Sequence, residues 1–244
     1  MTHAVVSQSE WTDARKALLA KEKQFTQARE ALAAQRRDLP WVKIDKPYVF
    51  DGPNGRETLA DLFAGKGQLI VYHFMLGPGW VQGCPSCSYL ADHFDGAIPH
   101  LAQRDVTMLA ISRAPLAEID NYKKRMGWKF KWLSSNANDF NRDFAVSFGK
   151  DEIGSDATYN FGTTKAESEE MPGISVFAKD KAGNVFRTYS AYARGLDMIV
   201  GTYQLLDLAP KGRDEDSLPW TMAWVRRHDE YETAALAKPG CCCS

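Results

Sequence analysis

The chain has 244 residues, of which 44% are hydrophobic and 25% are charged; these values are ordinary for a globular protein and exclude a disordered or collagen-like chain. Thirty Lys and Arg residues stand against 31 Asp and Glu, a formal net charge of -1 without blocks of like charge, which excludes the basic surface typical of nucleic-acid or anionic-membrane binding. The apolar runs are far shorter than the ~20 residues of a membrane-spanning helix.

The first predicted element is a long amphipathic helix. Residues Ser9 to Arg37 contain no Pro or Gly and are rich in strong helix formers, and Ser7 and Glu10 are spaced as a capping box. One helical face carries the apolar residues Trp11, Ala14, Leu18, Phe25, Ala28 and Leu32. We expect this stripe to pack on its own domain or on a partner subunit, and in the second case the protein is a homodimer. The sequence before this helix has no charged segment followed by an apolar one, so we expect a cytoplasmic protein.

Two buried strands with a cysteine pair between them follow. Gln68 to Met75 and Val106 to Ser112 are nearly continuous apolar runs, as expected for strands covered on both faces of a sheet. Cys84 to about Leu101 has helical spacing, and so has Leu116 to Met126. The pattern strand, helix, strand, helix predicts parallel strands. His73, within the first strand, is expected to be a hydrogen-bonded core imidazole.

The second half of the chain adds a β-hairpin and a final helix. Ile174 to Ala178 and Asn184 to Tyr189 flank a Gly-containing turn, and Ala193 to Leu208 returns to helical spacing, whereas Trp132 to Glu170 shows no sustained period and is expected to be irregular. This element order is that of the thioredoxin fold, an α/β sheet flanked by helices. We therefore expect an N-terminal helix at 1–38, a thioredoxin-like domain at 39–210 and a C-terminal extension at 211–244.

The five cysteines form two groups, Cys84-Pro85-Ser86-Cys87 and the terminal Cys241-Cys242-Cys243. A C-x-x-C that follows a strand and opens a helix is typical of a redox motif. Unpaired N–H groups at a helix N-terminus favour a thiolate, so Cys84 is the expected nucleophile, and Cys87 would resolve the mixed disulfide. Pro85 is compatible with the first helical turn because no intrahelical hydrogen bond is lost there.

Further residues are candidates for substrate binding beside the cysteine pair. Trp80 stands in the preceding Gly-rich loop, together with Pro85 and Ser86 inside the motif, and Arg113 follows the second strand, where its charge would favour the Cys84 thiolate. Met171-Pro172 precedes the hairpin strand. We predict a cis peptide bond there, whose neighbouring backbone would pair with an incoming extended chain or thiol ligand.

The chain also resembles a known family. The motifs that carry the likeness include His73-Phe74, Gly77-Pro78-Gly79-Trp80, Gly83-Cys84-Pro85-Ser86-Cys87, Ser112-Arg113-Ala114-Pro115, Met171-Pro172-Gly173 and Trp224-Val225-Arg226-Arg227-His228-Asp229. From roughly Leu39 to Tyr231 the sequence is similar to the bacterial thioredoxin-like family known as domain of unknown function 899. The resemblance implies a dithiol-disulfide oxidoreductase without a cofactor, whose partner is a protein or small-molecule thiol or disulfide.

The sequence leaves two other classes of function open. The segment Asp51-Gly-Pro-Asn-Gly, with the helical turn after it, looks like the opening of peroxiredoxins, so a thiol peroxidase is the alternative. The peroxidatic motif P-x-x-x-T-x-x-C is incomplete, however, because Gly77 replaces its proline and Val81 its threonine. A non-enzymatic binding protein is the third class.

The remaining sulfur and nitrogen ligands predict no metal site. His93 and His100 follow the cysteine pair on what is expected to be one continuous helix, too far along it to share an ion with the cysteines. The terminal Cys241 to Cys243 are expected to be inert, or else to exchange with a Cys84–Cys87 disulfide as an internal relay.

Overall fold

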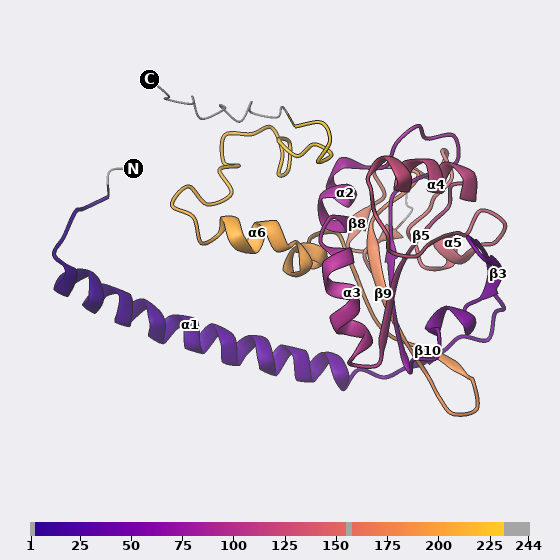
Figure 1. Ribbon diagram of the computed structural model, residues 1–244, viewed down its shortest axis with the longest axis horizontal. Coiled ribbons are helices and arrows are strands. Elements are labelled where there is room, and N and C mark those ends of the chain that lie inside the picture. The colour runs from indigo at the N-terminus through magenta and orange to yellow at the C-terminus, as the bar shows by residue number, and fades with distance from the viewer. Residues whose placement is uncertain (1–2, 155–157, 232–244) are drawn as a thin grey trace, which may run out of the picture. The chain divides into compact units, whose positions relative to one another are not determined.

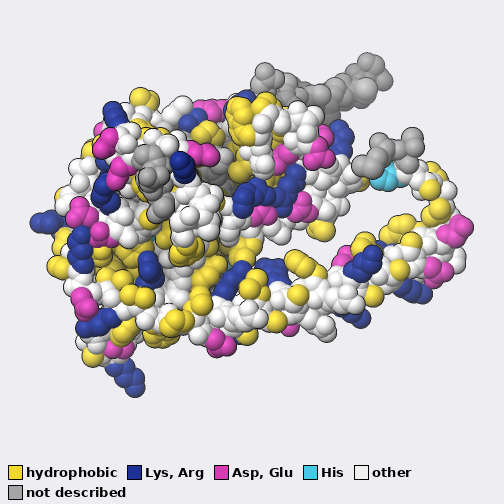
Figure 2. Space-filling model, turned by 180° about the vertical axis from the view of Figure 1, so that it is seen from behind, with side chains coloured by type: hydrophobic (Ala, Val, Ile, Leu, Met, Phe, Trp, Pro, Cys, Tyr) yellow, Lys and Arg dark blue, Asp and Glu magenta, His cyan; other side chains and the backbone are white. Residues whose placement is uncertain are grey.

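The N-terminal unit is a single long helix. The computed structural model describes residues 3–154 and 158–231, and the chain forms two compact units, Met1–Trp41 and Val42–Ser244. Helix α1 (Gln8–Arg37) begins with the predicted capping box, in which the Ser7 and Glu10 side chains each accept a hydrogen bond from the other's backbone N–H. No residue of α1 is buried, and hydrophobic, basic and acidic side chains are interspersed along it (Figure 2). That the apolar stripe of α1 packs on its own domain or on a partner subunit stays a prediction.

The second unit is built on a mixed sheet. In spatial order its eight strands are β1 (Val42–Lys43), β10 (Val185–Tyr192), β9 (Gly173–Lys179), β4 (Gln68–His73), β5 (Val106–Ser112), β6 (Trp132–Ser134), β2 (Val49–Gly52) and β3 (Gly55–Thr58). The central strands β4, β5 and β6 are parallel; the sequence predicts this for β4 and β5, whereas β6 lies in the segment expected to be irregular. Strands β9 and β10 form the predicted antiparallel hairpin, and β2 and β3 form a second one.

Alternate residues of the central strands enter two cores. On β4, Ile70 and Tyr72 pack with the helices α2 (Pro85–Ala91), α3 (Phe94–Ala102), α4 (Leu116–Arg125) and α6 (Gly201–Leu206) and with the 3₁₀ helix η2 (Ala193–Ile199). Leu69 and Val71 face the opposite core, with the 3₁₀ helix η1 (Asp61–Phe63) and α5 (Phe140–Asp143). Helices α2 and α3 follow one another along the sheet (Figure 1). The result is a thioredoxin-like α/β fold preceded by a β-hairpin, which confirms the predicted fold class.

The helix after the cysteine pair is broken, which the sequence did not predict. Helix α2 ends at Ala91 and α3 begins at Phe94. Between them the His93 N–H bonds to the Leu90 carbonyl three residues back, so the α-helical ladder is interrupted. The imidazole of His93 is hydrogen-bonded to Thr202, 2.9 Å away, at the start of α6. The His93 side chain, at this break, therefore connects the start of α3 to α6.

The segment that was expected to be irregular contains regular structure. Besides β6 and α5, it holds a small separate sheet of β7 (Thr158–Tyr159) and β8 (Thr164–Lys165). Residues 211–231 of the C-terminal extension belong to the same compact unit as the strands, and Val225 is buried in the core around α2. None of the helices within residues 3–154 and 158–231 combines the length and apolar character that crossing a bilayer demands.

His73 is a buried imidazole at the end of β4, and it has its expected hydrogen bond. Its Nε2 lies 2.9 Å from the Ser175 hydroxyl, and its ring stacks on Phe140 with 5.5 Å between ring centroids. Burial lowers the pKa of His73 to about 3. The folded protein therefore holds this ring neutral where the unfolded chain would protonate it.

This difference predicts a pH-dependent stability. Because the folded pKa lies below the unfolded one, the contribution of His73 is complete above about pH 6.5 and is lost as pH falls toward 3, by about 1.4 kcal/mol per pH unit. We expect His73→Gln to flatten the dependence of the unfolding free energy on pH over this range, measured by urea unfolding at several pH values. If the unfolding free energy of variant and wild type changes equally with pH, His73 is not the cause of this pH dependence.

Candidate active site

Cys84 lies where the chain leaves β4 and enters α2, as the spacing predicts. It is the N-cap residue of α2, with Pro85 at the first helical position. Its backbone N–H bonds to the Met75 carbonyl, and its carbonyl accepts hydrogen bonds from the backbone N–H and the hydroxyl of Ser88. The Cys84 sulfur is thereby held at the surface end of the helix, partly buried, while its main chain is fixed on both sides.

The surroundings of Cys84 favour its thiolate. The hydrogen bond with the Cys87 side chain is the largest cause that lowers the pKa of Cys84, to about 7. Burial opposes this shift, while the backbone N–H groups of Ser86 and Cys87 and the positive charge of Arg227 add to it. A thiol of this kind is substantially ionised at neutral pH and is therefore a competent nucleophile.

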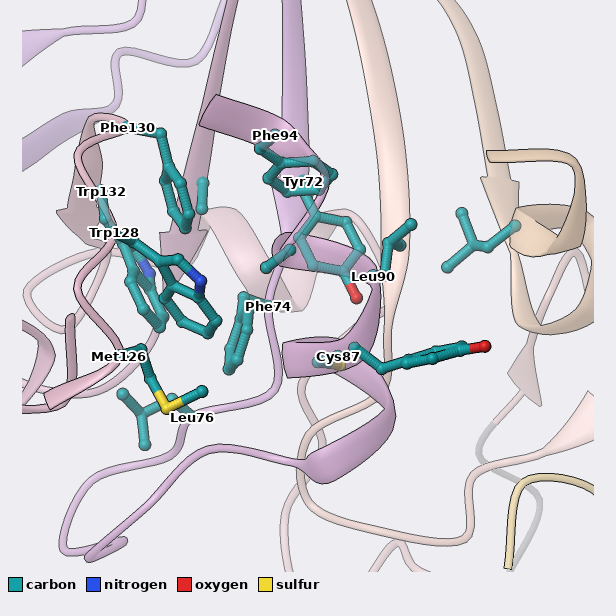
Figure 3. Packing of buried hydrophobic residues seen from close by; sticks show 14 of the residues in the cluster. Tyr72, Phe74, Leu76, Cys87, Leu90, Phe94, Met126, Trp128, Phe130 and Trp132 are labelled. Carbon is teal, nitrogen blue, oxygen red and sulfur yellow. The ribbon is translucent and has the colours of Figure 1, made fainter. Parts of the chain in front are cut away.

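Cys87 has the opposite character. Its side chain is 2% exposed, and burial raises its pKa well above the ordinary value. The Tyr72 hydroxyl lies near Cys87 (Figure 3), and its hydrogen bonding to the sulfur lowers the pKa of Cys87 without offsetting the larger effect of burial. Both cysteines are free thiols, so the structure describes a reduced pair with one acidic and one weakly acidic member.

The loop that carries Cys84 is fixed by a residue from the C-terminal extension. Arg227, 7% exposed, donates from Nη2 and Nε to the Gly83 carbonyl at 2.5 and 3.1 Å and from Nε to the Tyr122 hydroxyl at 3.1 Å. Tyr122 in turn lies 2.8 Å from the Ser88 hydroxyl, which donates to the Cys84 carbonyl. A Cβ on Gly83 would lie 2.5 Å from the Phe74 ring, so only glycine permits this close approach.

A pocket of about 470 Å³ opens beside the two sulfurs. It is within the size range of small-molecule sites. Its walls come from β4 and α2, from the segment before β9, from η2 and α6, and from the C-terminal extension; they include Tyr72, Met75, Cys84, Ser86, Cys87, Leu90, Met171, Pro172, Leu196, Val200, Tyr203 and Met222. The structure thus brings together five of the predicted site residues, namely Cys84, Ser86, Cys87, Met171 and Pro172.

Three other predicted site residues do not line this pocket. The Trp80 side chain packs on the core beside Gly77. Pro85 occupies the first helical position of α2. Arg113 forms an ion pair with the buried Glu170, with 2.5 Å between Nε and Oε1. The cation that acts on Cys84 is Arg227 rather than Arg113.

The predicted cis bond at Met171–Pro172 is wrong, because the described residues contain no cis peptide bond. The neighbouring backbone is also already paired. The Met171 N–H donates to the Val146 carbonyl at 2.8 Å, and the Pro172 carbonyl accepts a hydrogen bond from the Tyr159 hydroxyl. An incoming extended chain would find these groups occupied, so the expected thioredoxin-type docking through this backbone is absent, although both residues stay at the pocket.

Within the described residues no group of three or more His, Cys, Asp or Glu side chains is arranged to hold a metal ion. Because the helix is broken between α2 and α3, His93 and His100 do not lie on one continuous helix with the cysteines. The predicted separation of these histidines from the cysteines therefore no longer follows from helix length alone. His93 instead binds Thr202. The terminal Cys241 to Cys243 lie outside the described residues.

Sequence reasoning missed three residues of the site, Tyr72, Tyr159 and Arg227. Tyr72 and Cys87 are brought together by the turn of the chain after β4, which no local pattern reveals. Tyr159 lies in the segment without a period. Arg227 belongs to the motif Trp224-Val225-Arg226-Arg227-His228-Asp229, which carries part of the family resemblance, and this was the available signal.

The fold and the paired thiols define a thioredoxin-fold protein with a Cys-x-x-Cys pair at the start of a helix. Its sequence matches the family described as "Bacterial protein of unknown function (DUF899)" over residues 1–231, and the chain belongs to this family. A search of curated proteins gave no match.

Several solved structures have a similar chain path. Peroxidoxin BcpB from Mycobacterium tuberculosis is 13% identical, with a TM-score of 0.45 over 68% of this chain and 97% of that one. Peroxiredoxin Q from Xanthomonas campestris is 16% identical, with a TM-score of 0.42 over 66% and 90%. The reduced 2-Cys peroxiredoxin of Plasmodium vivax is 18% identical, with a TM-score of 0.40 over 69% and 93%.

Proposed function

We propose that the protein is a thiol-disulfide oxidoreductase in which Cys84 attacks and Cys87 resolves. The Cys84 thiolate attacks one sulfur of a substrate disulfide, forms a mixed disulfide and releases the first substrate thiolate. Cys87 then loses its proton and attacks the Cys84 sulfur, which forms the Cys84–Cys87 disulfide and releases the second thiolate. The proton of Cys87 ends on one released thiolate and solvent protonates the other according to its pKa; a dithiol reductant, itself oxidised to a disulfide, then returns the cysteine pair to its starting state.

The observation that supports this proposal most strongly is the asymmetry of the pair. Cys84 is partly buried, receives hydrogen bonds at its sulfur and has a pKa of about 7, whereas Cys87 is buried with a raised pKa. An attacking thiol reacts best when its pKa is near the ambient pH. A resolving thiol that stays protonated until the mixed disulfide forms cannot compete with it for substrate.

The partners follow from this chemistry. We propose a thiol or disulfide as substrate, contacting Ser86, Met171 and Pro172 at the pocket wall, with Trp80 and Arg113 acting only through the loops that they brace. A cysteine content without a disulfide framework fits a reducing compartment, so we place the reaction in the cytoplasm. A second copy of the chain, bound through the apolar stripe of α1, is a further proposed partner.

Thiol peroxidase activity is the alternative. It requires a group that binds peroxide near Cys84, and the Val81 side chain, at the position of the peroxidatic threonine, is 95% exposed and has no hydroxyl. Peroxidase activity is one outcome of the experiment below. A non-enzymatic binding protein, which would use its cysteines for metal delivery or a partner contact, is the other alternative, and the metal content of the purified protein tests it.

The proposal is tested by mapping the thiols of the full chain. Trypsin cuts after Lys66 and Arg104, so Cys84 and Cys87 fall in one peptide and Cys241 to Cys243 in another. We expect oxidation by a disulfide to make the first peptide lighter by two hydrogen atoms, and iodoacetamide to label Cys84 at a rate that is half-maximal near pH 7 because its thiolate reacts.

Two results would count against the proposal. Labelling of Cys87 before Cys84 at mildly acidic pH would reverse the assigned roles. Oxidation by a hydroperoxide, with no reaction toward disulfides, would make the protein a peroxidase. Loss of thiols from the terminal peptide upon oxidation would identify the internal relay.

A further inference from the structure

The pocket beside Cys84 and Cys87 has predominantly apolar walls. Met75 and Leu90 line it next to the sulfurs, and Leu196, Val200 and Met222 line it farther along the chain. All five of these side chains are buried or partly buried in the core around α2. A pocket of about 470 Å³ with such walls suits a small apolar group.

The chain itself occupies the place where an extended polypeptide would dock. The backbone of residues 146–148 runs antiparallel to residues 169–171, through hydrogen bonds from Phe148 N–H to the Glu169 carbonyl and from Met171 N–H to the Val146 carbonyl, at 2.9 and 2.8 Å. Beyond it the Pro172 carbonyl is bound by Tyr159. A substrate strand would have to displace these bonds to pair with the backbone next to Cys84.

The lining of the pocket carries one positive charge, Arg194, and two negative charges, Asp197 and Glu167, and so presents no positive cluster. Asp197 lies between Arg194 and Arg213, at 2.9 and 2.8 Å, and Arg213 also pairs with Asp207 at 2.7 Å. Glu167 adds a negative charge to the lining. This arrangement favours a neutral ligand over a polyanionic one.

Resting on the function proposed above, we propose that the substrate is a small disulfide with an apolar body, which the pocket holds while Cys84 attacks one of its sulfurs. The Cys84 thiolate displaces the leaving thiolate, and the apolar half stays bound to Cys84 as a mixed disulfide. Cys87 then displaces it, so that one substrate disulfide becomes two thiols and the enzyme dithiol becomes a disulfide. A dithiol reductant closes the cycle.

The test compares three disulfides on the full-length reduced protein: 2-hydroxyethyl disulfide, benzyl 2-hydroxyethyl disulfide and insulin. We expect the benzyl compound to oxidise the pair at least about tenfold faster than 2-hydroxyethyl disulfide, because an apolar group in a hydrophobic pocket discriminates by this order. Insulin should react more slowly than the benzyl compound.

Two variants that fill the pocket test its role. In Val200→Phe and in Ser168→Phe, where the wild-type side chains line the pocket from different segments, the preference for the benzyl compound should fall to about one. Overpacking at the buried Val200 can prevent folding. Ser168 is half-buried, so Ser168→Phe still tests the pocket if Val200→Phe does not fold. Leu205→Phe, at a position that is 68% exposed and outside the lining, is the matched control and should keep the wild-type preference.

The outcomes separate the two proposals. Equal rates for all three disulfides, fastest reaction with insulin, or an unchanged preference in both pocket variants would overturn the apolar substrate and leave the oxidoreductase standing. No reaction with any disulfide would overturn both. Faster oxidation by cumene hydroperoxide than by the benzyl compound would also overturn both, in favour of a peroxidase.

Discussion

Replacing Cys84 by serine should lower the rate of disulfide reduction by at least ~10³-fold. The hydroxyl of serine does not ionise at neutral pH, so the attacking anion is lost, and removal of a nucleophile commonly costs this much or more. The rate is measured with 2-hydroxyethyl disulfide and a coupled dithiol reductant. Retention of more than a few per cent of the rate would show that another thiol attacks.

Cys87→Ser is the matched variant, because it removes the other thiol of the same pair. It should still react once, since Cys84 keeps its backbone N–H partners and the charge of Arg227. The product is a mixed disulfide that persists, visible as a mass increase of the tryptic peptide with Cys84. A variant that turns over as fast as the wild type would mean that Cys87 does not resolve the intermediate.

Arg227→Gln is expected to have the second-largest effect. The guanidinium binds the Gly83 carbonyl and the Tyr122 hydroxyl in a buried place, and its loss leaves buried acceptors unpaired, at a cost of about 3 kcal/mol in unfolding free energy. The pKa of Cys84 should rise because a positive charge that favours its thiolate is removed. Urea unfolding measures the first effect and the pH profile of alkylation the second.

Arg226→Gln is the control for this variant. Arg226 is the neighbouring residue and is exposed, and its side chain donates hydrogen bonds to the carbonyls of Ala223 and Val225. Its substitution should change the unfolding free energy by no more than about 0.5 kcal/mol and leave the alkylation profile in place. Equal effects of the two substitutions would show that the buried contacts of Arg227 determine neither the unfolding free energy nor the pKa of Cys84.

The sequence predicted the fold and the place of Cys84 at the start of a helix because both depend on local patterns. Buried parallel strands have continuous apolar runs, and β5 begins and ends where its run does, at Val106 and Ser112. The capping box of α1 is likewise a short-range signal. Cys84 could be placed at the start of a helix because strand, loop and helix follow one another directly.

The rest of the site could not be predicted because it depends on contacts between distant segments. Arg227 lies 144 positions from Gly83, and its partner could equally have been solvent. The break at His93 depends on Thr202, 109 positions away. The proline segment was expected to be open to a substrate, and the chain's own residues 146–148 close it.

Tyr159, in β7, connects the small sheet of β7 and β8 to the walls of the pocket. Its hydroxyl donates to the Pro172 carbonyl and accepts from the Ala193 N–H, so one side chain ties together two pocket walls that are 21 positions apart in the chain. On the function proposed above, the attacking and resolving thiols lie at the strand–helix turn, whereas the side chain of Tyr159 holds two walls of the pocket together from outside that turn. Changes at Tyr159 would then alter the shape of the pocket while the backbone around the thiol pair stays the same.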